Sequence, residues 1–368
     1  MESDATFSTP WRARAIACYL PQFHRTVEND AWWEPGYTEW TITRKMRPMF
    51  RGHAQPLVPG ELGYYDLLDA DARSAQAELA RRHGIEGFCY WHYWSRGKRL
   101  LSRPFDEVLT SGQPDFPFCL GWANHDWRDH WVGADRELWR QEYGGPDDEE
   151  AHFRFLAAAF ADTRYIRVAG RPLFVVHRPG ALPDGWLDRL NAFVTARGQE
   201  EVESVAWGQV GALHGPLPPG FRARVAGEAI YDFHMDWLRT PRRGPARWVA
   251  RLRRLRGQPV RYRQEAWNRW LDALPNGDDI LPCCLPRWDN TPRAHSRGFL
   301  LEAATAEGFA AQVRSALTRL ETRPPEQRVL FVRSWNEWGQ GNMLEPDSRF
   351  GRGFLEALRS VLANEREV

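Results

Sequence analysis

Short apolar stretches alternate with helical segments along almost the whole chain, and this alternation restricts the possible folds more than any other feature of the sequence. The stretches that we expect to be strands are residues 13–20, 87–90, 116–120, 173–176, 204–207, 226–230, 280–285 and 329–332. Apolar residues recur at helical spacing in the segments 70–83, 149–161, 186–197, 264–274, 308–320 and 351–363. Eight strands that alternate with helices predict an α/β fold of the (β/α)8 or TIM barrel type.

The length and composition of the chain are compatible with a single domain. With 368 residues, of which 43% are hydrophobic, the chain could bury one large core or two smaller ones. No stretch rich in proline, glycine or serine divides it, so we expect one barrel domain over residues 13–363 and a tail over residues 1–12. A doubly wound sheet is the rival fold. It normally has a glycine-rich turn after its first strand, where this chain has Pro21 to His24 instead.

Charge and hydropathy argue against several classes of protein. The formal net charge of +1 gives no general attraction to nucleic acid. The first residues lack the apolar core of a signal peptide, and no run approaches the roughly 18 apolar residues of a membrane span, so we expect a cytoplasmic protein. The five cysteines fall inside expected strands and form no CxxC motif, which favours buried thiols over disulfides.

Aromatic and polar residues follow nearly every expected strand. Active sites of barrels lie at the face where the strands end, so we expect these side chains to converge there. Indoles offer flat apolar faces for sugar rings, and many of the 19 tryptophans lie beside polar residues. The residues that we expect to contact a substrate are Gln22, His24, Trp40, Trp91, His92, Trp122, Asn124, His125, Trp127, His177, Trp288, Asp289, Asn290, Trp335, Asn336 and Trp338.

The stretch from Val329 to Glu345 contains the strongest candidate for a catalytic group. Its apolar first part leads into Trp335, Asn336, Glu337 and Trp338 and then into glycine, as expected for a buried strand that opens into a loop. We predict that Glu337 is the essential carboxylate, because an acidic group among aromatic side chains suits glycosyl transfer. The alternative is that Glu337 forms a structural salt bridge while the tryptophans fill the core.

Other chemistries have weaker support. His125, Asp126 and His130 could be imagined as metal ligands, but no HExxH motif occurs, so we expect neither a metal nor another cofactor. The GxSxG motif of serine hydrolases is absent as well.

Six motifs connect the chain to a known family. They are YLPQFH (19–24), NDAWWEPGYTEW (29–40), GFCYWHYW (87–94), FCLGWANHDW (118–127), WDNTPR (288–293) and SWNEWGQGNMLEPD (334–347). Over about residues 13–363 the chain resembles the WbsX-type proteins of bacterial surface-polysaccharide loci, which are grouped with glycoside hydrolase family 99-like domains. The resemblance implies a (β/α)8 barrel without a metal that acts on glycans, often O-antigen. Members are commonly described as glycosyltransferases, and their hydrolase relatives are retaining endo-α-mannosidases.

The resemblance also implies two catalytic carboxylates, of which this chain keeps one. In the hydrolases the first takes the proton of the sugar's own 2-hydroxyl, which attacks the anomeric carbon, and the second is acid and base for the leaving group. The first matches Glu337, whereas the second falls on Gln340, whose amide cannot donate a proton as a carboxylic acid does. Glu345 or Asp126 could supply the proton, the leaving group could be a phosphate that needs none, or the site could bind glycan without turnover.

We favour retaining glycosyl transfer at an α-linked sugar in polysaccharide assembly, from a sugar phosphate or lipid-linked saccharide, with hydrolysis and glycan binding as alternatives. General acid catalysis is worth about a hundred- to ten-thousandfold, so its loss speaks most against hydrolysis of an ordinary glycoside.

A basic segment follows the sixth expected strand. Between Arg247 and Arg256, one helical face carries Trp248, Val249, Leu252 and Leu255, and arginines surround the other. This pattern is typical of a helix that lies on an anionic membrane or binds a phosphorylated carrier lipid. The alternative is a solvated outer helix packed on the barrel.

Overall fold

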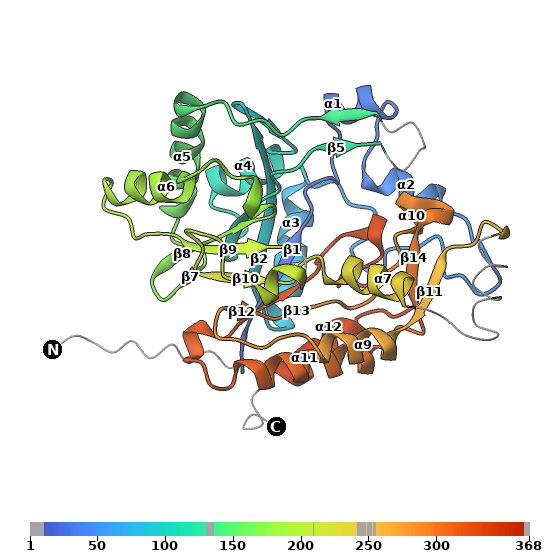
Figure 1. Ribbon diagram of the computed structural model, residues 1–368. Coiled ribbons are helices and arrows are strands. Elements are labelled where there is room, and N and C mark those ends of the chain that lie inside the picture. Colours follow the sequence, from blue (N-terminus) through green and yellow to red (C-terminus); the bar gives the residue numbers. More distant parts are fainter. Residues whose placement is uncertain are drawn as a thin grey trace.

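The computed structural model describes residues 11–129, 136–208, 210–240, 248, 252 and 255–363, and a barrel of parallel strands surrounded by helices fills this part of the chain (Figure 1). Its strands are β1 (Arg14–Tyr19), β2 (Ile85–Ser95), β4 (Phe118–Trp122), β8 (Arg171–Val176), β9 (Glu203–Trp207), β10 (Ala223–Val225), β12 (Ile280–Leu281), β13 (Cys283–Cys284) and β15 (Val329–Val332). Neighbours pair in the order β12-β10-β9-β8-β4-β2-β1-β15-β13, each pair parallel. The expected (β/α)8 barrel is confirmed.

One interrupted strand closes the barrel. β12 and β13 belong to the single stretch expected at 280–285 and are separated by Pro282. β12 pairs with β10 on one side, and β13 pairs with β15 on the other. Proline has no N–H to donate, so the ladder is broken at that residue, while its carbonyl still accepts the N–H of Phe331 at 2.9 Å. The two ends of the sheet are therefore one segment.

The strand expected at 226–230 is wrong in its position. β10 ends at Val225, and α7 (Ala229–Arg239) begins four residues later. The chain turns at Gly227, where a Cβ atom would come within 1.8 Å of the Trp207 indole. The apolar residues Ile230 and Phe233 are buried at helical spacing, which the sequence pattern could not separate from a short strand.

Helices cover the outside of the barrel, as Figure 1 shows. They are α3 (Ala70–Arg82), α4 (Arg103–Ser111), α5 (Pro146–Phe160), α6 (Trp186–Thr195), α9 (Gln264–Asp272), α11 (Ala306–Leu320) and α12 (Gly353–Leu362). The long segment after β1 holds α1 (Val27–Trp32) and α2 (Glu39–Lys45), and α10 (Thr291–Ala294) follows β13. Short strands add β3 (Lys98–Leu100), β5 (Trp127–Arg128), β6 (Glu137–Trp139), β7 (Arg167–Val168), β11 (Val260–Arg263) and β14 (Phe299–Glu302).

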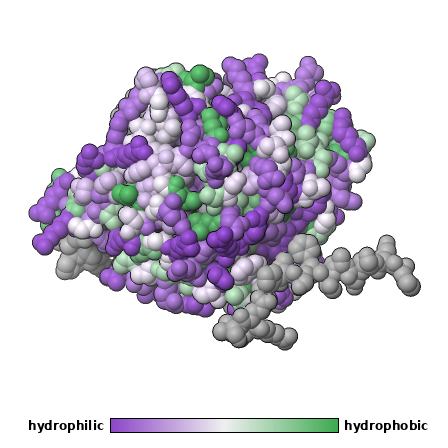
Figure 2. All heavy atoms as spheres, turned by 180° about the vertical axis from the view of Figure 1, so that it is seen from behind, coloured by the Kyte–Doolittle hydropathy of each residue, from purple (hydrophilic) through white to green (hydrophobic). Residues whose placement is uncertain are grey.

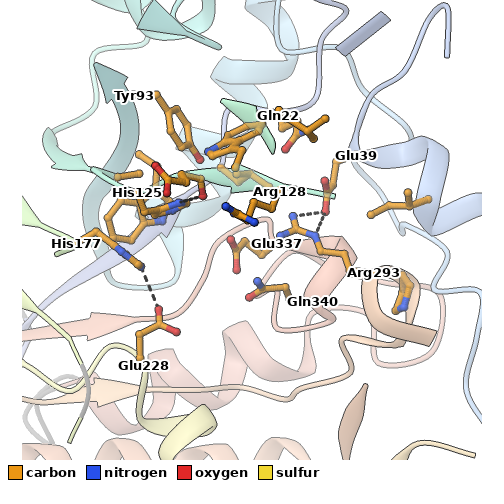
Figure 3. Close-up of a pocket in the computed structure, with 18 of the residues that line it drawn as sticks. Gln22, Glu39, Tyr93, His125, Arg128, His177, Glu228, Arg293, Glu337 and Gln340 are labelled. Carbon is orange, nitrogen blue, oxygen red and sulfur yellow. Dashed lines mark hydrogen bonds and ion pairs between the residues drawn. The ribbon is translucent and has the colours of Figure 1, made fainter. Parts of the chain in front are cut away.

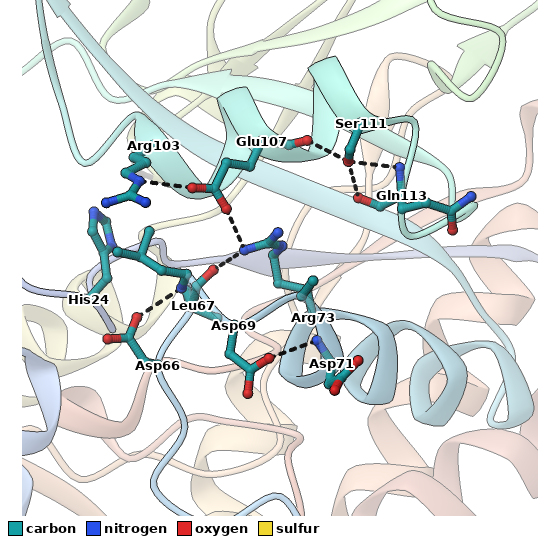
Figure 4. A network of polar contacts seen from close by, with 12 residues as sticks. His24, Asp66, Leu67, Asp69, Asp71, Arg73, Arg103, Glu107, Ser111 and Gln113 are labelled. Carbon is teal, nitrogen blue, oxygen red and sulfur yellow. Dashed lines mark hydrogen bonds and ion pairs between the residues drawn. The ribbon is translucent and has the colours of Figure 1, made fainter.

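A buried arginine ties α3 to α4 (Figure 4). The side chain of Arg73 is almost fully buried, donates to the carbonyl oxygen of Leu67 and lies 3.0 Å from the Glu107 carboxylate. Arg103, which is exposed, donates to the other carboxylate oxygen of Glu107 at 2.8 Å. Because a buried guanidinium requires such partners, this network fixes the segment around Leu67, which leads into α3.

Among the helices that the structure describes, none combines the length and the apolar character needed to cross a bilayer. On the face opposite to that of Figure 1, polar residues dominate and hydrophobic residues gather only in small groups (Figure 2). The expected basic helix from Arg247 to Arg256 falls mostly outside the described residues; of its apolar face, Trp248, Leu252 and Leu255 are described, and all three are exposed.

Candidate functional site

A cavity of about 440 Å³ opens at the carboxyl ends of the strands (Figure 3). Among the expected site residues, the cavity is lined by Gln22, Trp91, His125, Asp126, Trp127, His177, Glu337 and Gln340. Further lining residues that were not among those expected are Trp33, Tyr37, Glu39, Tyr93, Arg128, Arg178, Glu228, Tyr231, Arg293 and Arg333. The cavity therefore combines carboxylates, arginines and aromatic rings from strand ends far apart in sequence.

Glu337 lies at the floor of this cavity, just before the single turn η5 (Trp338–Gln340). The preceding residue, Asn336, is fully buried and holds this end of the chain against β1, because its amide donates to and accepts from the backbone of Leu20 at 3.0 and 2.8 Å. Asn342 Nδ2 donates to Glu337 Oε2 at 3.4 Å. These contacts keep the carboxylate of Glu337 at a fixed position facing the cavity.

Two arginines flank Glu337. Arg293 Nη2 and Nε donate to Glu39 Oε1 at 2.5 and 3.1 Å, and Arg333 Nη1 lies 3.1 Å from Glu228 Oε1. Burial lowers the pKa of each guanidinium, but its paired carboxylate and Glu337 raise the pKa more, so that both values lie above the ordinary one. The floor thus holds three carboxylates around two arginines that remain charged.

A glycine is required where the loop of η5 crosses this floor. A Cβ atom on Gly339 would lie 1.9 Å from Glu39 Oε1 and 2.9 Å from Arg293 Nε. Any side chain at this position would displace the ion pair between α2 and α10.

Gln340 faces the cavity from the end of η5. Arg333 Nη2 donates to Gln340 Oε1 at 3.3 Å, and the Gln340 carbonyl accepts the N–H of Asp289 at 2.9 Å. The amide oxygen is therefore directed to the guanidinium, and the amide supplies an N–H donor but no acidic proton.

Glu228, one of these three carboxylates, also pairs with His177. His177 Nε2 lies 3.3 Å from Glu228 Oε1, and Trp207 Nε1 donates to that oxygen at 3.4 Å. Burial raises the pKa of Glu228, but the Arg333 guanidinium and the hydrogen bond with His177 lower it, and on balance the pKa is well below its ordinary value. Glu228 is therefore ionised at neutral pH.

Aromatic side chains form the walls. Trp33 stacks on Tyr37 with ring centroids 5.5 Å apart, and Tyr93 meets Trp127 edge to face at 4.9 Å. The His125 ring lies 4.7 Å from that of His177, and burial lowers the pKa of His125 to about 4, so it is uncharged at neutral pH. Flat apolar faces beside hydroxyl and amide groups suit a sugar ring.

Glu345 does not line the cavity. Its side chain is buried behind η5, where Oε2 accepts from Trp338 Nε1 at 2.6 Å and from the Tyr65 hydroxyl at 2.9 Å, and Oε1 accepts from Gln76 Nε2 at 2.7 Å. Burial raises the pKa of Glu345 to about 7. Its position supports the loop that carries Glu337 and cannot place a proton on a substrate in the cavity.

Most of the other expected tryptophans and histidines belong to the core. Buried residues outside the cavity lining are His24, Trp40, His92, Trp122, Trp288, Trp335 and Trp338. Alternation along β2 explains part of this result, because Trp91 and Tyr93 face the cavity while His92 faces the opposite side, toward His152 of α5.

The expected polar residues after the strands mainly fix loops. Asn124 exchanges hydrogen bonds with the backbone of Arg178 at 2.7 and 2.9 Å, and Asn290 Oδ1 accepts the Phe299 N–H at 2.8 Å. The Asp289 carboxylate is held by His53, Gln55 and Thr291 at 2.9, 2.7 and 2.6 Å. These residues shape the rim without lining the cavity.

The sequence offered a signal for some of the residues that were missed. Glu39 and Arg293 occur within the motifs NDAWWEPGYTEW and WDNTPR. Glu228 was hidden because the misplaced strand at 226–230 enclosed it. Within the described ranges, no three histidine, cysteine, aspartate or glutamate residues gather in a way that could hold a metal ion, and His130 falls outside those ranges.

Comparisons with known proteins agree with the motifs. Residues 15–358 match the model of the family described as Glycosyltransferase WbsX, which confirms the resemblance. Two proteins from strains of Xanthomonas campestris pv. campestris, both described as "Uncharacterized protein WxcX", are 33% identical over an alignment 368 positions long, which covers 97% of this chain and 50% of theirs. The chain thus spans about half the length of these curated relatives.

Solved structures with the same fold have little sequence identity. A "Glycoside hydrolase-like protein" superposes with a TM-score of 0.58 at 13% identity, covering 96% of this chain and 94% of that one. The GH99 endo-α-mannosidase from Bacteroides thetaiotaomicron superposes with a TM-score of 0.54 at 12% identity, covering 95% and 96%. At such identities the likeness shows the fold alone.

Proposed function

Because the chain belongs to the WbsX glycosyltransferase family, we propose that it is a carbohydrate-active enzyme that transfers a glycosyl group at an α-linked sugar with retention of configuration. The observation that carries this proposal is the ionisable floor of the cavity, where Glu337 lies between two charged arginines under aromatic walls. The biological setting that we propose is the metabolism of a bacterial surface polysaccharide such as O-antigen.

In this proposal Glu337 takes the proton of the sugar's 2-hydroxyl, which then attacks the anomeric carbon. The transition state resembles an oxocarbenium ion, and the three carboxylates of the floor favour its positive charge. Tyr93 and Tyr231 remain neutral hydrogen-bond donors, because burial and the nearby Glu337 carboxylate raise their pKa values.

The leaving group distinguishes transfer from hydrolysis. Gln340 occupies the place of the acid, and of the two other candidates for the proton donor, Glu345 lies behind η5 and Asp126 lines the cavity. A phosphate leaves as a stable anion without a proton, so a sugar phosphate, nucleotide sugar or lipid-linked saccharide fits this site better than an ordinary glycoside. Hydrolysis like that of an endo-α-mannosidase is the second candidate, which the shared barrel and the exposed Asp126 at the cavity support.

Replacing Glu337 by glutamine tests the proposed function. Wild-type protein and Glu337→Gln are incubated with a panel of nucleotide sugars and α-hexosides, and consumption of each donor is followed by mass spectrometry. We expect Glu337→Gln to lose at least about a hundredfold in rate, because the amide cannot accept the proton, while its affinity for the same donor changes little.

A control and an opposite outcome complete this experiment. Glu61→Gln removes a surface carboxylate that pairs with Arg352 outside the cavity, and its rate should equal that of wild type. Consumption of no donor by the wild type, together with glycan binding that Glu337→Gln leaves intact, would instead indicate a glycan-binding protein. Consumption of α-hexosides alone would favour the hydrolase.

We also propose that the protein works in the cytoplasm and contacts the membrane peripherally through the basic segment from Arg247 to Arg256. The exposure of Trp248, Leu252 and Leu255 supports this proposal, because an apolar helix face beside many arginines suits the surface of an anionic bilayer.

A further inference from the structure

Glu228 and Gln340 are held by the same guanidinium. Arg333 Nη1 lies 3.1 Å from Glu228 Oε1, and Arg333 Nη2 donates to Gln340 Oε1 at 3.3 Å. Figure 3 shows Glu228 and Gln340 both directed to the cavity from different strand ends. Glu228 is therefore the carboxylate that neighbours the position where the family's second carboxylate would be.

Glu228 is held through one of its two oxygens. His177, Trp207 and Arg333 all approach Oε1, at 3.3, 3.4 and 3.1 Å. The side chain is 19% exposed, and it lines the cavity. The contacts leave Oε2 as the oxygen that can meet a ligand, and three groups with N–H donors favour the ionised form.

We propose that Glu228 is the catalytic base that removes the proton from the incoming acceptor hydroxyl. This inference rests on the proposed function. It assigns to Glu228 the removal of the acceptor's proton, the base step that the amide of Gln340 cannot perform. The acceptor oxygen forms its bond to the anomeric carbon as its proton passes to Glu228 Oε2, and the bond from that carbon to the sugar's own 2-oxygen breaks. That oxygen recovers its proton from Glu337, and Glu228 releases its proton to solvent.

Protonation of the leaving group by an acid is not needed when the donor is a glycosyl phosphate. The bond from the anomeric carbon to the phosphate oxygen breaks in the first step, and the bonding pair leaves with the phosphate. Two arginines that line the cavity, Arg128 and Arg178, can meet that charge. Donors with a phosphate leaving group therefore suit a site that has a base and no acid.

Glu228→Gln tests this inference through the choice of acceptor. With a nucleotide sugar that the wild type consumes, transfer to a hydroxyl acceptor is compared with transfer to azide, which attacks as an anion and needs no base. We expect Glu228→Gln to lose about a hundred- to ten-thousandfold with the hydroxyl acceptor and to form the glycosyl azide near the wild-type rate. Formate should restore part of the hydroxyl reaction in Glu228→Ala, whereas Glu337→Gln should lose both reactions.

A matched control separates catalysis from the loss of an ion pair. Glu86 is 22% exposed and pairs with Arg14 at 2.6 Å at the amino ends of the strands, away from the cavity. Glu86→Gln removes a carboxylate from an arginine in the same way, so both reactions should continue at the wild-type rate. If Glu228→Gln does not fold, Glu228→Asp replaces it, because aspartate keeps the charge beside Arg333 but withdraws the oxygen from the cavity.

Two outcomes would overturn the inference in different ways. Equal losses with the hydroxyl acceptor and with azide in a folded variant would mean that Glu228 only supports Arg333, and the proposed function would stand. Consumption of no donor by the wild type would refute the proposed function and the role of Glu228 together.

Discussion

Replacement of Glu345 by glutamine should change how the stability of the protein depends on pH. The Glu345 carboxyl group is 2% exposed and lies among Trp338, Gln76 and Tyr65. Burial raises its pKa from an ordinary 4.5 to about 7, although its hydrogen bonds act in the opposite direction. Ionisation of Glu345 is therefore less favourable in the folded protein than in the unfolded chain.

The sign and size of the effect follow from these two pKa values. Below about pH 4.5 the group is protonated in both states. As the pH rises toward 7 the unfolded chain ionises first, so the free energy of unfolding falls, and above about pH 7 the loss is complete. The difference between 4.5 and about 7 corresponds to about 3 kcal/mol. Glutamine does not titrate, so Glu345→Gln should gain about 3 kcal/mol relative to wild type across this window.

Urea unfolding measures this difference directly. Tryptophan fluorescence of both proteins is followed at several values of pH between about 4.5 and 8. Hydrogen bonds that the glutamine amide of the variant cannot make with Trp338, Gln76 or Tyr65 shift its unfolding free energy by the same amount at every pH. A difference between the two proteins that stays constant over this range would refute the reasoning, because the carboxyl group would then ionise equally in both states.

Two further predictions concern the network of Arg73 and the basic segment. Glu107→Gln leaves the buried Arg73 without a carboxylate and should cost about 1–3 kcal/mol of unfolding free energy. Arg103→Ala removes an exposed partner of Glu107 and should cost less than about 1 kcal/mol. Equal losses of the two variants in urea unfolding would contradict this difference. If the segment from Arg247 to Arg256 binds anionic membranes, the wild type should cosediment with phosphatidylglycerol vesicles, and added salt or the double variant Arg251→Gln, Arg254→Gln should weaken binding. Equal binding to uncharged vesicles would speak against this attraction.

The sequence was sufficient to predict the barrel and the face that carries the cavity. Apolar runs such as 329–332 and helical repeats such as 308–320 report their structure locally, because side chains alternate along strands and recur every three or four residues along helices. The placement of Glu337 and Gln340 at the cavity also followed from their position just after a buried strand. The prediction of the sixth strand was wrong in position because β10 has three residues, too few to show an alternation of apolar and polar side chains.

Only the tertiary structure decided which side chains meet. The pairs Glu39 with Arg293 and Glu228 with Arg333 join residues that are 254 and 105 positions apart, and no local pattern links them. The tryptophans show the same limit, because an indole that fills the core and an indole that lines a cavity occur in similar sequence: Trp91 faces the cavity while Trp335 is fully buried. Which of the two occurs depends on strand register and on the loops folded over each strand end, and both arise from packing across the whole barrel.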